Sequence, residues 1–148
     1  MKPDPHAVLG FLTELLMVEV APKAQPPYLG GTIGMVGTAL AVLTEEWDRA
    51  ASRLVEENRA IRALFRRAER VRLDPLLADE LRALAGTEDD DLRISALDRG
   101  NTGLRAALIR LQIAVETAVD EASKALNEAI WAELSASTER RRQASAPF

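Results

Sequence analysis

The sequence predicts an all-α fold, a helical bundle with two long antiparallel helices plus shorter helices. Hydrophobic residues make up 47% of the chain and aromatic residues only 4%, so Ala, Leu, Ile and Val dominate, and this composition favours helices. Apolar residues recur at the helical period over two long stretches, and Asp-Pro pairs mark helix starts. The 148 residues fit one domain. We therefore expect a single helical domain over 1–148, with a tail that frays from position 138 onward.

The first expected helix begins at Asp4 and Pro5. Aspartate is a favoured N-cap, and a proline in the first turn gives up no intrahelical hydrogen bond. Pro22, Pro26 and Pro27 then prevent the helix from continuing. This helix is therefore short.

The second expected helix is long and runs from Thr32 to Val71. This stretch contains no proline, and no glycine after Gly37. Most of its apolar residues follow one another at intervals of three, four or seven: Ile33, Val36, Leu40, Leu43, Trp47, Leu54, Ile61, Leu64 and Ala68. At 1.5 Å per residue, such a helix reaches roughly 55–65 Å.

Two short helices are expected next. One begins at Asp74 and Pro75 and ends at Gly86. The other begins in the acidic stretch after Thr87 and closes near Gly100. Together they give the chain room to reverse direction.

A second long helix is then expected, capped by Asn101 or Thr102, with apolar residues spaced helically from Leu104 to Ile130. The reversal before it makes the two long helices antiparallel. Because the first helix is too short to cover their apolar faces, we expect a homodimer or a protein partner.

The stretch from Tyr28 to Thr44 is rich in glycine and carries no charge. It does not match the spacing of a phosphate-binding loop, and no strand is expected before it. As a helix, it places Gly30, Gly34, Gly37 and Ala41 near one face, which lets another backbone approach closely. We therefore assign these four residues to packing or an interface, and we expect Gly34→Leu to destabilise the fold by roughly 1–3 kcal/mol through overpacking.

Charge and composition narrow the functional classes. The net charge is −4, with acids and bases intermixed, which gives no basic footprint for nucleic acid. There is no cysteine, which excludes disulfides and thiolate metal sites. The first twenty residues lack a basic segment and are interrupted by Glu14, unlike a signal peptide, and the uncharged run is short for a membrane span. We expect a cytoplasmic protein with no membrane partner.

The acidic residues offer one alternative chemistry. Glu45 and Asp48 lie three residues apart and Glu116 and Asp120 four apart, so each pair can share a helical face and hold Mg²⁺. Such an arrangement is similar to the helical nucleotide pyrophosphohydrolases. Arginines and lysines at helical spacing give the competing interpretation, a salt-bridged surface. His6 is the sole histidine, so paired Glu-x-x-His iron sites are impossible. We expect no catalytic residue, no metal and no cofactor.

Two tryptophans and two asparagines are also considered for their environments. Trp47 and Trp131 each lie late in an apolar stretch, which predicts packing in a core or an interface. The other interpretation is that they line an apolar pocket. Asn58 stands among charged residues and is expected in solvent, while Asn101 beside Gly100 is expected as a helix cap.

Two stretches resemble known families. "PYLGGTIGMVGTALA" resembles the helix start of the folate cyclodeaminase/cyclohydrolase family, which implies an all-helical dimer subunit. "PHAVLGFLTELLMVEVAP" with "MVGTALAVLTEEW" is similar to a family of small helical bacterial proteins of unknown function associated with acyl-CoA dehydrogenases and aminoglycoside-phosphotransferase-like kinases. That family usually carries asparagine at the position of Thr38. This second resemblance implies an accessory or interaction domain without assigned catalytic residues.

We therefore expect a non-enzymatic helical module that self-associates or docks on a protein. The alternative is a magnesium-dependent nucleotide pyrophosphohydrolase-like or folate cyclohydrolase-like enzyme.

Overall fold

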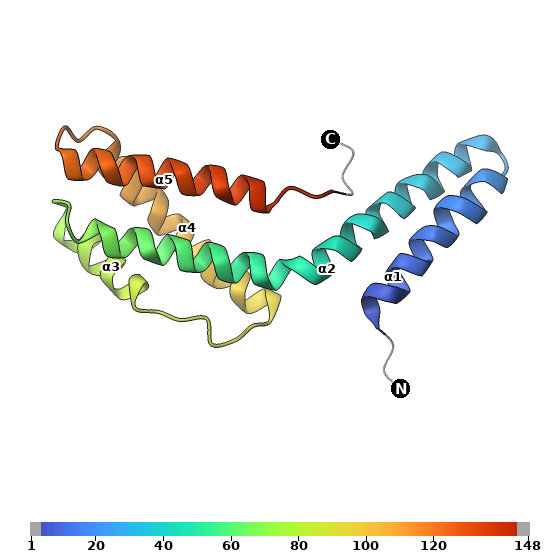
Figure 1. Cartoon of the computed structure of the whole chain (residues 1–148), viewed down its shortest axis with the longest axis horizontal. Helices are drawn as coiled ribbons and strands as arrows, with labels where there is room; N and C mark the ends of the chain where they lie inside the picture. The colour runs from blue at the N-terminus through green and yellow to red at the C-terminus, as the bar shows by residue number, and fades with distance from the viewer. Residues whose placement is uncertain (1–3, 145–148) are drawn as a thin grey trace. The chain divides into compact units, whose positions relative to one another are not determined.

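The computed structural model describes residues 4–144, and within them it is built of helices and their connections, which confirms the predicted all-α class (Figure 1). The chain divides into two compact units. Unit 1 comprises the described residues up to Ala50 together with those from Arg142 onward, and unit 2 comprises Ala51–Arg141. The single domain expected from the sequence stays a prediction.

Unit 1 is a helical hairpin. Helix α1 spans Pro5–Glu14 and continues as a π-helical turn, Leu15–Val20, and a 3-10 turn, Ala21–Lys23. As predicted, Asp4 caps it: the carboxylate accepts a hydrogen bond from the His6 amide at 3.0 Å. Helix α2 then runs over Pro27–Ala68, and its part up to Ala50 belongs to unit 1. The predicted long helix is thus confirmed.

Two of the glycines on α2 allow a close approach to the first half of the hairpin. A Cβ at Gly30 would lie 2.7 Å from the Ala21 carbonyl oxygen, and one at Gly37 would lie 2.5 Å from the Met17 sulfur. Gly34 differs, because a Cβ there would meet nothing within 4 Å. The expectation that Gly34→Leu overpacks a backbone contact within the chain is therefore wrong. Gly34 lies to one side of the line joining Gly30 and Gly37, which are two turns apart.

Unit 2 holds the hydrophobic core. It contains the rest of α2 with α3 (Pro75–Ala85), α4 (Ile94–Glu116) and α5 (Glu121–Arg140). Asp74 caps α3 as predicted, accepting from the Leu76 amide at 3.0 Å. The largest core side chains are Ile61, Phe65, Leu81, Leu104, Leu111, Leu126 and Ile130.

The second predicted long helix is two helices. α4 begins at Ile94 and passes through Gly100 and Asn101, where a boundary was predicted. The chain then turns, and Asp120 starts α5 by accepting from the Ser123 amide at 2.9 Å. The β-branched Thr117 and Val119 before this cap disfavour helix.

The C-terminal tail begins later than predicted. Helix α5 continues to Arg140, two residues past the expected start of fraying. The last four residues of that predicted tail lie outside the described part of the chain.

Candidate functional site

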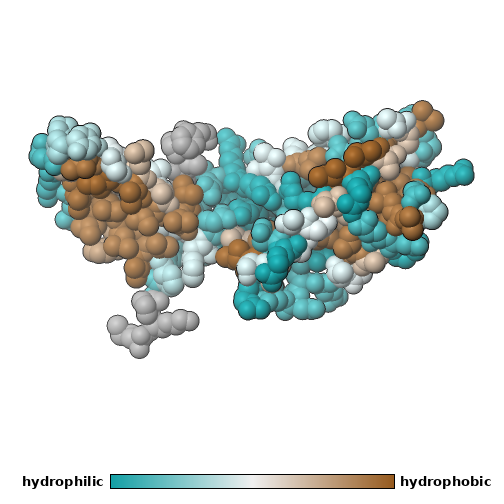
Figure 2. Space-filling model, turned by 180° about the vertical axis from the view of Figure 1, so that it is seen from behind, coloured by the Kyte–Doolittle hydropathy of each residue, from teal (hydrophilic) through white to brown (hydrophobic). Residues whose placement is uncertain are grey.

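Unit 1 exposes a broad apolar surface, which we call the hairpin surface. Helix α1 contains no buried residue. In Figure 2 apolar side chains gather over this hairpin. The residues of the hairpin surface are Val8, Phe11, Leu12, Met17, Val18, Val20, Tyr28, Leu29, Met35, Val36, Leu43 and Trp47. Soluble monomers rarely expose a contiguous apolar patch above a few hundred square ångströms. This surface therefore points to an interaction.

Four residues of the hairpin surface belong to a strict repeat along α2, which we call the α2 stripe and which also includes the partly buried Ile33 and Leu40. Its members alternate at intervals of four and three: Leu29, Ile33, Val36, Leu40, Leu43 and Trp47. The same intervals continue along the helix to Ala50, Leu54, Glu57, Ile61, Leu64 and Ala68, all of them buried. By contrast, Val36 is 50% exposed and Trp47 is 57% exposed. The early part of one continuous stripe thus remains uncovered by the chain itself.

The two apolar helical stretches of unit 1 also satisfy a length and hydropathy test for membrane spans. These stretches are Pro5–Lys23 and a window within Pro27–Ala68, and at most 6% of either window is buried. Core helices and signal sequences meet the same test. Length and hydropathy therefore do not distinguish a surface that contacts lipid from one that contacts protein.

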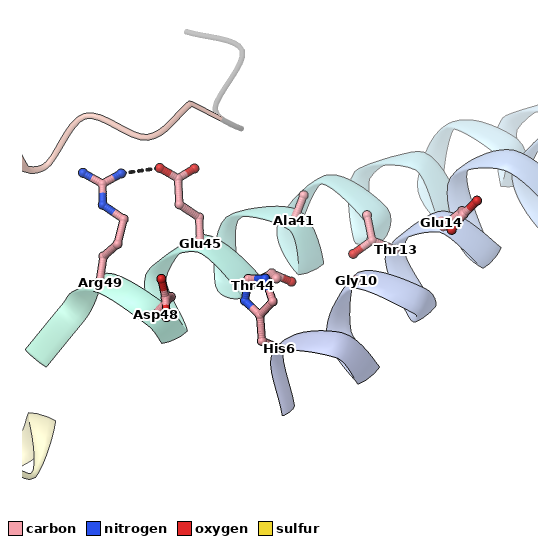
Figure 3. A pocket seen from close by; sticks show the side chains of 9 residues that line it. All are labelled: His6, Gly10, Thr13, Glu14, Ala41, Thr44, Glu45, Asp48 and Arg49. Atoms are coloured by element: carbon pink, nitrogen blue, oxygen red, sulfur yellow. Dashed lines mark hydrogen bonds and ion pairs between the residues drawn. The ribbon is translucent and has the colours of Figure 1, made fainter. Parts of the chain in front are cut away.

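A groove of about 440 Å³ lies between α1 and α2 within unit 1 (Figure 3). Residues of α1 on one side and of α2 on the other line it: His6, Gly10, Thr13, Glu14, Ala41, Thr44, Glu45, Asp48 and Arg49. Arg49 forms an ion pair with Glu45. The Glu45 carboxylate also accepts from the Ala144 amide at 3.1 Å. These interactions occupy the carboxylate, as the salt-bridge interpretation predicted.

The structure does not unite the four predicted magnesium ligands in one unit. Glu45 and Asp48 lie on the part of α2 in unit 1, whereas Glu116 ends α4 and Asp120 caps α5 in unit 2. Over residues 4–144, no three His, Cys, Asp or Glu side chains are grouped so that they could hold a metal ion.

The packing residues predicted from the sequence have different environments. Gly30, Gly37 and Ala41 lie on the side of α2 that faces α1, while Gly34 meets open space. Trp47 belongs to the α2 stripe. Trp131 on α5 is 55% exposed. Neither tryptophan fills the core of its own unit.

A buried polar cluster in unit 2 was not predicted from the sequence. Asn58 is fully buried, not solvated, and its side-chain oxygen accepts from Asn101 at 3.0 Å. Its amide donates to Asp89 at 3.0 Å. Arg62 also donates two hydrogen bonds to Asp89, both at 2.9 Å, and these bonds are the first cause of the lowered pKa of Asp89. The cluster fixes α2, α4 and the connection before α4 in one register.

A second buried group in unit 2 is centred on Glu57, which lies beyond the α2 stripe at a position of the same four-and-three repeat. Its carboxylate accepts from Arg105, and from Arg141 at 2.7 Å. Burial raises the pKa of Glu57, but the hydrogen bonds and charges of the two arginines outweigh it, so the pKa lies below its ordinary value. Glu133 differs: burial raises its pKa above the ordinary value despite the nearby Arg140. The only sequence signal for Glu57 is a charge in an apolar repeat.

These polar groups are paired with one another and serve to hold helices together, whereas the hairpin surface has no cover within the described residues. Comparisons of the chain with protein-family models, with curated proteins and with solved structures find no match.

Proposed function

We propose that the protein is a non-enzymatic helical interaction module, working in the cytoplasm, and that the hairpin surface of unit 1 is its docking surface. The observation that carries this proposal is the repeat along α2: its later members from Ala50 to Ala68 are buried, whereas four members of the α2 stripe, Leu29, Val36, Leu43 and Trp47, are exposed. Burial of apolar area is the main driving force of protein association. A partner with an apolar helical face would bury this surface.

Site-specific photocrosslinking in living cells tests the proposal. A benzophenone amino acid replaces Val36 in the α2 stripe, and in a control chain it replaces Ile113 on α4, which is 66% exposed. We expect a protein adduct from position 36 and none from position 113. Equal adducts from both positions, or no protein adduct at either, would contradict the proposal.

A thermal shift screen tests the enzyme alternative. The ligands are Mg²⁺ with nucleotides, folates and acyl-CoA compounds. A ligand at one hundred times its dissociation constant stabilises a protein by about 2.7 kcal/mol, a shift that is readily measured. We expect no shift with any of them. A shift that is lost in Asp48→Asn would instead favour a site in the groove.

A further inference from the structure

We infer that the occupant of the hairpin surface is a second copy of this chain, and that the two copies pair through antiparallel α2 stripes. This inference rests on the proposed function and names its partner. It has three supports: the period of the stripe, its symmetry and its lack of charge.

The period of the α2 stripe is that of a helix-on-helix contact. Apolar residues that alternate at intervals of four and three form the seam along which helices pack knobs into holes. In unit 2 the later members of the same repeat, such as Leu54 and Ile61, are buried. The exposed members in unit 1 therefore have the spacing that another helix requires.

The stripe is also complementary to itself when reversed. Its positions pair about a two-fold axis level with Thr38: Leu29 meets Trp47 of the second copy, Ile33 meets Leu43, and Val36 meets Leu40. Each pair joins two apolar side chains, and a leucine faces the indole. Because such a contact is isologous, it closes as a dimer rather than a chain of copies.

Charge permits this pairing and favours its direction. From Ala24 to Thr44 the chain carries no Asp, Glu, Lys or Arg. The acids Glu45, Glu46 and Asp48 follow at one end of the stripe. A parallel pair would bring the acidic ends of both copies together, with Arg49 paired to Glu45 in each, whereas an antiparallel pair separates these ends by the length of the stripe. It places them near the start of the partner helix, where the helix dipole is positive.

A bilayer fits the first half of the hairpin less well than it fits α2, whose early part meets the test for a membrane span. The stretch Pro5–Lys23 carries Glu14 and Glu19, and a charge within the hydrocarbon region is disfavoured. Lipid also imposes no alternation of four and three residues. A membrane is therefore one outcome of the test and not the inference.

The first experiment measures the association of the full chain by sedimentation equilibrium across the micromolar range. We expect a species of twice 16.2 kDa. Val36→Glu should raise the dissociation constant at least about tenfold, because it places a carboxylate in the seam. Ile113→Glu is the matched control, since Ile113 is an exposed apolar residue on α4 and lies outside the hairpin surface. It should change the constant by less than about twofold.

The second experiment tests direction and does not depend on a disruptive variant. The chain has no cysteine, so introduced thiols are the only ones. In an antiparallel dimer the double variant Ile33→Cys/Leu43→Cys forms intermolecular disulfides. Neither single variant does, because equivalent positions are then roughly 15 Å apart along the axis. Crosslinking of the single variants would overturn the antiparallel arrangement.

The results of these experiments distinguish a failure of the dimer from a failure of the proposed interaction module. A concentration-independent species of 16.2 kDa, or equal effects of Val36→Glu and Ile113→Glu, would overturn the second copy as occupant. If position 36 then crosslinks to a different protein, the interaction module survives with another partner. If the monomer instead floats with neutral phosphatidylcholine vesicles and gives no protein adduct, both the inference and the proposed function fail.

Discussion

At the scale of single residues, the polar side chains buried in unit 2 decide how its helices align. Asn58 both accepts from Asn101 and donates to Asp89, so three segments share one side chain. A buried polar group that loses its partner costs about 1–3 kcal/mol, more than a hydrogen bond contributes on average. Such residues therefore penalise every other register of the same apolar stripes.

The asparagine pair gives the first prediction. Asn58→Leu and Asn101→Leu should each lower the free energy of unfolding by about 1–3 kcal/mol. The double variant should lose less than the sum of the two, because neither partner is then left unpaired. Urea denaturation at neutral pH measures all three. Asn127→Leu is the control: no described residue bonds its buried side-chain oxygen, so little change is expected. Additive losses would contradict a direct contact.

The pKa of Glu57 gives the second prediction. A carboxylate whose folded pKa lies below its ordinary value of 4.5 stabilises the fold above that value, and the stabilisation is lost as the pH falls through the folded pKa. Glu133 acts oppositely: its raised pKa favours folding at low pH, and that contribution is lost as the pH rises past 4.5. Glu57→Gln should cost roughly 1–3 kcal/mol at pH 6 and flatten the acid side of the stability curve. Urea midpoints from pH 6 to pH 3 measure this, and an unchanged slope would refute the assignment.

At the scale of elements, the hairpin of unit 1 depends on the approach of its first half to α2 at two glycines. The third prediction compares Gly30→Ala with Gly34→Ala. The first should destabilise by roughly 1–3 kcal/mol, because the new Cβ meets the Ala21 carbonyl at 2.7 Å and backbone has to move. The second should stabilise by up to about 1 kcal/mol, because alanine is a better helix former in open space.

Trp47 fluorescence in a Trp131→Phe background reports this hairpin alone, since Trp47 belongs to unit 1 and Trp131 to unit 2. Chemical denaturation followed at Trp47 ranks the glycine variants. If both substitutions shift the midpoint in the same direction, the two glycines do not differ as the structure requires.

The elements also show what could be predicted from the sequence. The starts of α1 and α3 were predicted because an aspartate followed by proline acts locally. The break at Thr117 was missed because apolar spacing continues on both sides of it, and Asp120 is a cap only if the chain turns there. Asn101 was misassigned because its burial depends on Asn58, forty-three positions away. The α2 stripe was visible in the sequence, but which part of it the chain covers is set by tertiary packing.

At the scale of the whole molecule, the two units differ in how they are stabilised. Every member of the main hydrophobic cluster lies between Ile61 and Leu134, within unit 2. In unit 1 the buried residues are small ones such as Gly37 and Ala50. A unit that buries little apolar area opens readily on its own.

This difference gives the last prediction, which hydrogen exchange of the full chain measures at two concentrations. In dilute solution, amides of α1 and of Pro27–Leu43 should exchange fast, because no core resists their opening, while those of Ile61–Ala68 and Leu104–Val115 stay protected. At a concentration where copies associate, protection should rise in unit 1 only, since mass action stabilises the part that binds. Val36→Glu should abolish that rise and leave unit 2 unchanged. Equal protection of both units in dilute solution would mean that the hairpin is stable without any partner, and the case for an occupant of its apolar surface would lose its energetic basis.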